Sequence, residues 1–97
     1  MAITEKQKRH LRSLAHKLKP VVIIGESGLS DSVLRELDLS ISHHELLKVR
    51  INAADRDARK KIIDELCSRA NALLIQSIGH IAVIYRAAKK PVIKLPS

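Results

Sequence analysis

A short loop with a glycine at each end is the first segment whose residues could do chemistry. It reads Gly25-Glu26-Ser27-Gly28 and stands between an apolar run and the start of a predicted helix. Glycine lets the backbone come close to a phosphate, the helix start offers unpaired N–H groups, and the serine hydroxyl adds a donor. A plain strand-to-helix turn explains the same spacing and is the simpler interpretation of the spacing alone. The loop is therefore a candidate phosphate-binding site with a purely structural alternative.

The sequence lacks the motifs of several other kinds of functional site. No Gly-Lys pair follows the loop, so it is not a Walker phosphate loop, and Leu29 occupies the position at which a nucleophile elbow requires glycine. His43 and His44 are adjacent, so on a helix they point about 100 degrees apart and do not readily share one metal. Cys67 is the single cysteine, which allows no internal disulfide. We expect no enzyme, no metal site, no cofactor and no small-molecule substrate.

Basic side chains form the second candidate site. The chain carries 18 Lys plus Arg against 10 Asp plus Glu, a net charge of +8, which points to a polyanionic partner. Residues 1–24 hold six basic and one acidic side chain, whereas residues 25–47 hold one basic and five acidic ones. The second predicted helix should therefore face away from a polyanion. The basic candidates are Lys8, Arg9, Arg12 and Lys19 around the first predicted helix, Arg56, Arg59 and Lys60 in the third, and Arg86, Lys89 and Lys90 near the C-terminus.

Each basic group also has a structural explanation. A solvated helix face normally mixes charges of both signs, and because Glu5 is the only acid along the first helix's basic arc, binding is favoured there. In the third predicted helix, pairs such as Lys60 with Asp64 would stabilise the helix, which accounts for part of its charge without a binding partner. Beyond Ala87, a flexible basic tail could wrap a phosphate backbone or simply keep the chain soluble.

Aromatic content limits how a nucleic acid could be held. Tyr85 is the only aromatic residue, with no Phe and no Trp in the chain. Proteins that stack bases on a sheet or barrel surface use several exposed aromatic side chains. If the partner is a nucleic acid, we therefore expect its backbone to be gripped.

Seven elements must position these residues. Thr4 and Gln7 have the spacing of a capping box, and Leu11, Leu14, Ala15 and Leu18 then recur on one helical face until Pro20. Residues 21–24 are all β-branched and predict a strand buried on both faces in the middle of a parallel sheet. The other predictions are a helix from Ser30 to near His43, a strand over 47–51 with one wet face, a helix from Asp55 to Ala70, and a hairpin of strands 73–78 and 81–86.

Ninety-seven residues with this order predict a single α/β domain. The order is helix, strand, helix, strand, helix, strand, strand, with a four-stranded mixed sheet. Two strand–helix–strand crossovers imply parallel pairings, and the final hairpin adds an antiparallel one. The chain shows neither a signal peptide nor an apolar run long enough for a membrane span, so we expect a cytoplasmic protein without a membrane partner. The sequence does not indicate an oligomeric state.

Five segments of the chain resemble the CRM domain, which is named for chloroplast RNA splicing and ribosome maturation, and in particular its stand-alone bacterial YhbY-type members. The matching segments are LRSLAH at 11–16, LKP at 18–20, GESGLS at 25–30, HHELLKV at 43–49 and IGHIAVIYR at 78–86. The resemblance implies a fold similar to the C-terminal domain of translation initiation factor three. It also implies RNA binding and association with precursors of the large ribosomal subunit.

Residue by residue, the resemblance places the family's Gly-x-x-Gly motif on Gly25 and Gly28. It places the basic surface on Arg12, Lys19, Lys48, Arg50 and Arg86. The acidic Glu26 departs from the basic or neutral loops of many members, which favours backbone contacts to phosphate over side-chain contacts. The alternative from another class is a protein-interaction module that docks on an acidic ribosomal or assembly partner.

Overall fold

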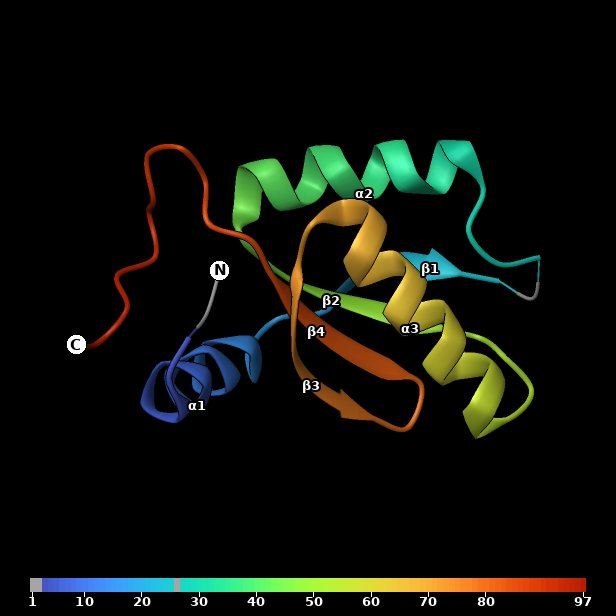
Figure 1. The fold of residues 1–97 in the computed structure, drawn as a ribbon, viewed down its shortest axis with the longest axis horizontal. Helices are drawn as coiled ribbons and strands as arrows, with labels where there is room; N and C mark the ends of the chain where they lie inside the picture. Colours follow the sequence, from blue (N-terminus) through green and yellow to red (C-terminus); the bar gives the residue numbers. More distant parts are fainter. Residues whose placement is uncertain (1–2, 26) are drawn as a thin grey trace.

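The computed structural model describes residues 3–25 and 27–97 and has the predicted order of elements. Three helices and one four-stranded mixed sheet form a single domain (Figure 1). The elements are α1 (Glu5–Ala15), β1 (Pro20–Ile24), α2 (Asp31–His44), β2 (Leu46–Ile51), α3 (Arg56–Ala70), β3 (Leu73–Ile78) and β4 (Ile81–Tyr85).

The helix starts were predicted correctly because their caps are local. Thr4 and Gln7 form a complete capping box before α1. The side chains of Ser30 and Asp55 each accept a first-turn backbone N–H of α2 and α3, at 3.2 and 2.8 Å. α1 ends earlier than its apolar pattern suggested, at Ala15, and leaves a short connection to β1.

The sheet order is β1-β2-β4-β3, which corrects one predicted pairing. β1 and β2 pair in parallel across the α2 crossover, as predicted. β2 and β3 do not pair with each other, because β4 lies between them and is antiparallel to both. The α3 crossover therefore skips one strand position, and the hairpin returns β4 into the gap. β4 becomes a central strand, with four of its five residues buried.

β1 is an edge strand, so the prediction of a strand buried on both faces is wrong. Val22 and Ile24 are buried, but Val21 and Ile23 are 50% and 60% exposed. A helix covers only one face of this strand, and four consecutive β-branched residues give no period-two signal that would reveal an open face. Pro20 suits the edge position because it has no N–H to donate.

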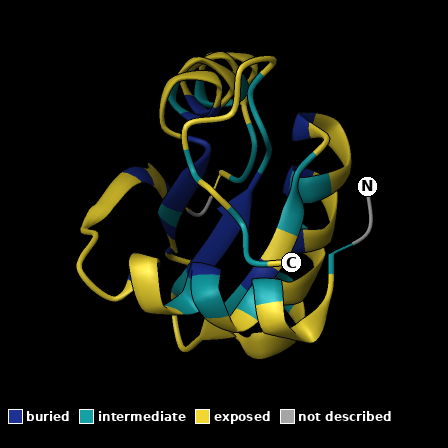
Figure 2. Ribbon diagram, turned by 90° about the vertical axis from the view of Figure 1, so that its left-hand side faces the viewer, coloured by how far each residue is buried: buried dark blue, intermediate teal, exposed yellow. Residues whose placement is uncertain are grey.

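Helices cover the two faces of the sheet unequally. α2 and α3 pack on one face over the larger core, which includes Leu37, Leu47 and Leu66. α1 and the C-terminal tail lie on the other face, over a smaller core around Leu11 and Tyr85. Figure 2 shows the buried residues gathered in the strands between these layers. α1 covers only part of its face, so a section of the sheet remains accessible there.

Residues 87–97 are packed against the domain, which corrects the prediction of a flexible tail. Ile93 and Leu95 join the core under α1, and the Gln7 side chain donates to the Pro96 carbonyl at 3.0 Å. The buried carboxylate of Glu45 accepts three backbone N–H groups of the tail at 2.8–2.9 Å. Burial raises the pKa of Glu45, but the three hydrogen bonds outweigh it and hold this pKa below its ordinary value.

Candidate nucleic-acid interface

A basic hollow of about 230 Å³ lies between α1 and the open part of the sheet. Arg12 and His16, one helical turn apart on α1, stand on one side, and Lys48 of β2 stands on the other. Ile78 and Ile81 contribute to its apolar lining. None of the described residues that line the hollow is acidic. An anion would therefore meet converging positive charge over an apolar base.

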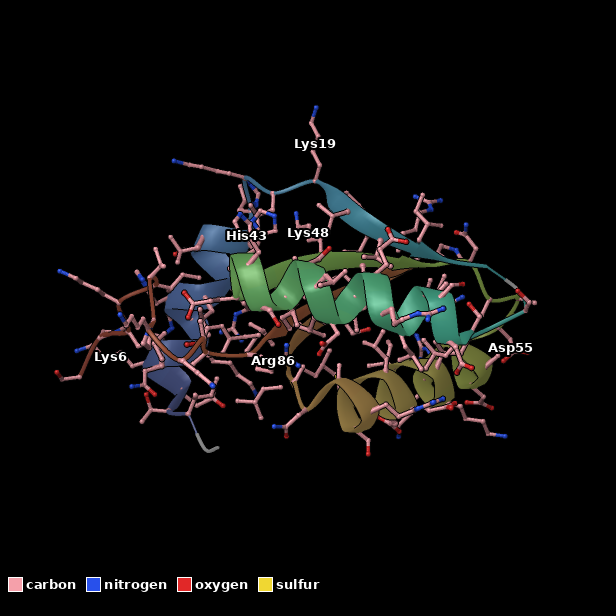
Figure 3. The ribbon with its side chains drawn as sticks, turned by 90° about the horizontal axis from the view of Figure 1, so that it is seen from above. Lys6, Lys19, His43, Lys48, Asp55 and Arg86 are labelled. Carbon is pink, nitrogen blue, oxygen red and sulfur yellow. The ribbon has the colours of Figure 1, made fainter. Side chains whose placement is uncertain are left out.

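Two more cations, Lys19 and Arg50, lie beside the hollow without lining it. Lys19 directly precedes Pro20, whose register partner on β2 is Lys48. Figure 3 shows Lys19 pointing away from the body of the protein near the start of β1. Arg50 follows Lys48 at a spacing of two residues on β2, so both side chains lie on the α1 side. We call Arg12, His16, Lys19, Lys48 and Arg50 the α1-side surface.

Arg50 is held in a defined orientation. Its Nε donates to the Asn52 Oδ1 at 2.9 Å. Its register neighbours across the sheet are Ile23 of β1 and Ile81 of β4. The guanidinium is exposed, so its remaining N–H groups and its flat face are available to a ligand.

The Gly-x-x-Gly loop lies at the same end of the sheet as Arg50. The Asn52 N–H donates to the Ile24 carbonyl at 2.8 Å and so fixes the start of the loop beside the end of β2. Gly28 has φ +78°, which favours glycine, and its N–H closes a turn on the Gly25 carbonyl at 3.0 Å. This N–H is thus used inside the turn. The predicted role of Glu26 lies outside the described residues.

Sequence comparison decides the family. The profile of the CRS1 / YhbY (CRM) domain matches residues 3–86. The chain belongs to the CRM domain family. Two bacterial relatives carry RNA binding in their names. A protein of Pseudomonas aeruginosa named a probable RNA-binding protein is 46% identical over 91 residues, covering 94% of this chain and 88% of its own length. An RNA-binding protein of Haemophilus influenzae is 43% identical over 94 residues, covering 97% and 95%.

A solved structure supports the same assignment. The solution structure of a Staphylococcus aureus protein, described as a candidate RNA-binding protein, matches this CRM domain with a TM-score of 0.84. The two chains are 36% identical, and the match covers 98% of this chain and 100% of the other. The fold predicted from the sequence, three helices and a four-stranded mixed sheet in one domain, is confirmed.

The predicted cations at the start of α3 lie apart from the α1-side surface. Arg56, Arg59 and Lys60 line a second hollow of about 420 Å³ together with Ser77 and Gly79. This hollow lies on the α3 side of the sheet. Within the CRM domain the two cationic groups are therefore on opposite faces, and a ligand would have to pass around the edge or the loop end of the sheet to touch both.

Arg86 has intramolecular partners. Its guanidinium donates to the Asp38 carboxylate at 2.8 Å, the Ser42 hydroxyl at 2.7 Å and the Ala70 carbonyl at 2.6 Å. Figure 3 shows it beside α2, while the side chain is only 21% exposed. It thus joins the end of β4 to α2 and to the last turn of α3. The structure gives Arg86 a structural role and places it apart from the α1-side surface.

The remaining predicted cations extend from the α1-side surface or lie elsewhere. Lys8 and Arg9 are one turn before Arg12 on α1 and continue its basic row. Lys89 and Lys90 are exposed in the tail segment that Glu45 fixes, near the C-terminal end of α2. That is the opposite end of the domain from the Gly-x-x-Gly loop (Figure 1).

The described residues show neither a reactive cysteine nor a group of metal ligands. Burial, and secondarily the charge of Asp64, raises the pKa of Cys67 to about 11, so its thiol stays protonated at neutral pH. Among residues 3–25 and 27–97, no three His, Cys, Asp or Glu side chains are grouped as metal ligands. No helix of this part of the chain is long and apolar enough to cross a bilayer.

Sequence reasoning missed three parts of this site. His16, one turn after Arg12, was not among the predicted site residues. Asn52, which orients Arg50, and Gln76, which lines the basic hollow, gave no sequence signal. Their positions follow from the strand register and from a bulge in β3, which are long-range properties of the sheet.

Proposed function

We propose that this CRM domain binds RNA and carries out no reaction on it. The observation that carries the proposal is the convergence of Arg12, His16 and Lys48 on a hollow whose described lining contains no acid. Phosphate contacts supply most of the sequence-independent affinity in such complexes. The names of the bacterial relatives support RNA as the polyanion.

The Gly-x-x-Gly loop is proposed to lie at the border of this interface. It stands at the end of β1 next to the Arg50 and Asn52 pair. Ser27 is exposed and offers a hydroxyl, whereas the Gly28 N–H is already used. We therefore assign the loop a supporting contact to the RNA backbone and assign most of the affinity to the α1-side surface.

The salt dependence of RNA binding tests the proposal. A double variant, Arg12→Gln with Lys48→Gln, should weaken binding by at least about tenfold and reduce the log–log salt slope by about 1.5, since each lost phosphate contact removes about 0.7–0.9. The matched control is Arg35→Gln with Lys61→Gln, which removes the same charge from the α2 and α3 side. Equal effects of the two double variants, or salt-independent binding by the unchanged protein, would contradict the proposed site.

The resemblance to ribosome-maturation proteins supports a more specific proposal about which RNA is bound. We infer that the RNA is ribosomal RNA in a precursor of the large subunit, with the protein acting in the cytoplasm as an assembly factor. Sedimentation of cell extracts checks this: the protein should travel with large-subunit precursors, and the Arg12 and Lys48 double variant should shift to the top of the gradient. Co-migration with the small subunit alone would contradict it.

A protein partner is the second candidate, and one groove favours it. Leu14, Leu18 and Val21 line an apolar groove of about 490 Å³ between α1 and β1, with Lys17 and Lys19 also in its lining. An acidic amphipathic segment would complement this surface. Nuclease treatment before sedimentation separates the two functions: loss of ribosomal association indicates RNA, and its survival indicates protein.

A further inference from the structure

One row of side chains crosses all four strands on the α1 side of the sheet. Ile23 of β1 is in register with Arg50 of β2, Arg50 with Ile81 of β4, and Ile81 with Ile78 of β3. Ile23 and Ile78 are 60% and 64% exposed, and Ile81 is partly exposed. We call these four residues the isoleucine row. It forms an apolar strip, with one cation inside it, at the end of the sheet that carries the Gly-x-x-Gly loop.

Phosphate groups do not explain exposed isoleucines. An RNA duplex turns phosphate and ribose outward and keeps its base faces stacked inside, so it would leave this aliphatic surface without an apolar partner. The flat faces of unpaired bases are apolar and lose contact with water when they cover such side chains. The row therefore complements unpaired RNA better than paired RNA.

Arg50 gives the row a planar platform. Its guanidinium is exposed, and the hydrogen bond from Nε to Asn52 fixes its orientation. Guanidinium planes stack on bases as aromatic rings do, and Arg50 carries positive charge as well. Tyr85, the only aromatic residue, is 1% exposed and is not available for stacking.

We propose that the isoleucine row binds unpaired nucleobases, with one base stacked on the guanidinium plane of Arg50 and flanked by Ile23 and Ile81. The inference rests on the proposed RNA binding and names its substrate class, which is a single-stranded or looped segment. Arg12 and Lys48 in the adjoining hollow hold the phosphates of the same segment. The Gln76 amide, which also lines the hollow, offers a donor and an acceptor to a base edge.

Charge-conserving variants test the stacking plane. Arg50→Lys keeps the charge and removes the plane, so it should weaken binding of a single-stranded oligonucleotide about tenfold with an unchanged salt slope. Binding of a continuous duplex should change by less than about twofold. Arg35→Lys, on α2, is the matched control and should change neither. A fluorescent base analogue in the single strand should lose its binding-induced change in emission with Arg50→Lys.

A second pair of variants tests the aliphatic part of the row. Ile23→Thr keeps a β-branched side chain in β1 and should weaken single-strand binding without altering the salt slope. Val92→Thr changes another exposed aliphatic residue, 79% exposed in the tail, and should have no effect. Thermal unfolding of all four variants should match that of the unchanged protein, because these side chains lie at the surface.

The outcomes separate this inference from the proposed function. If Arg50→Lys weakens single-strand and duplex binding equally, or weakens neither, the inference is overturned. Salt-dependent RNA binding, which is the proposed function, still stands in that case. Failure of the unchanged protein to bind any RNA probe overturns both. Sedimentation analysis adds one more outcome: a dimer that Ile23→Thr dissociates would make the row a contact between copies of this chain and would overturn the proposal.

Discussion

Glu45 shows how one residue can override local preference. Its φ of +67° is a backbone conformation that favours glycine, and it stands at the C-cap of α2. The unusual conformation is kept because Glu45 is buried, with 1% of the residue exposed, and its carboxylate accepts the N–H groups of Ala88, Val92 and Ile93. The side chain thus stabilises the tail over a separation of more than 40 residues. Glycine at this position would relieve the strain and lose all three bonds.

We predict that Glu45→Gln lowers the free energy of unfolding at neutral pH by about 2–3 kcal/mol, because hydrogen bonds to a charged acceptor become bonds to a neutral one. The pKa of Glu45 is lower in the folded protein than its ordinary value of 4.5. Its contribution is therefore complete above about pH 4.5 and disappears as the pH falls through the folded-state pKa. Urea unfolding at several pH values measures this. A difference between the two proteins that stays constant down to pH 3 would contradict the prediction.

The same residue marks the limit of what could be predicted from the sequence. Thr4, Ser30 and Asp55 were identified as caps because a cap and its partner lie three residues apart. The partners of Glu45 lie far along the chain, and the basic residues beyond Ala87 suggested a flexible tail instead. Local hydrogen bonds leave a spacing in the sequence, whereas long-range ones do not.

At the scale of elements, Arg86 connects β4 to both helices on one face. It reaches the carboxylate of Asp38, the hydroxyl of Ser42 and the last-turn carbonyl of Ala70. The family resemblance had placed it on the RNA-binding surface. In the structure its N–H groups are used in contacts that join β4 to α2 and α3, which leaves few of them for phosphate. Its place in the RNA interface stays a prediction.

We predict that Arg86→Gln destabilises the protein by about 2 kcal/mol, since the lost bonds include charge-assisted ones and leave a helix carbonyl without its donor. The salt slope of RNA binding should not change. Thermal unfolding and a salt titration of the same variant check both parts. A reduced slope with unchanged stability would return Arg86 to the RNA interface.

β1 and the isoleucine row show a second limit of prediction from the sequence. The order of the elements could be predicted from the periodicities. The solvent-exposed face of β2 could be predicted because Lys48 and Arg50 alternate with apolar residues. Neither the edge position of β1 nor the alignment of Ile23 with Ile78 could be read, because both depend on which strands pair. A glycine loop and a count of cations were visible in the sequence. The isoleucine row could be recognised only once the register of the sheet was known.

At the scale of the whole molecule, charge is distributed by face. The basic α1 and the α1-side surface lie on one side of the sheet, and α2, from the acidic segment of residues 25–47, lies on the other. α2 therefore lies on the opposite side of the sheet from the proposed RNA surface. The start of α3 is the exception, because Arg56, Arg59 and Lys60 line a hollow on the α2 and α3 side. A short RNA segment that only fills the α1-side surface cannot reach both faces.

We therefore predict that the effect of Arg56→Gln with Lys60→Gln depends on RNA length. An oligonucleotide just long enough to fill the α1-side surface should bind the variant as tightly as the unchanged protein. A longer RNA can pass around the end of the sheet at Gly79, which lines the α3-side hollow, and should lose several-fold in affinity and about 1.5 in salt slope. Titrations with oligonucleotides of increasing length measure the onset. Weakening already at the shortest length would place the start of α3 in the primary interface, and no weakening at any length would remove these cations from the RNA interface.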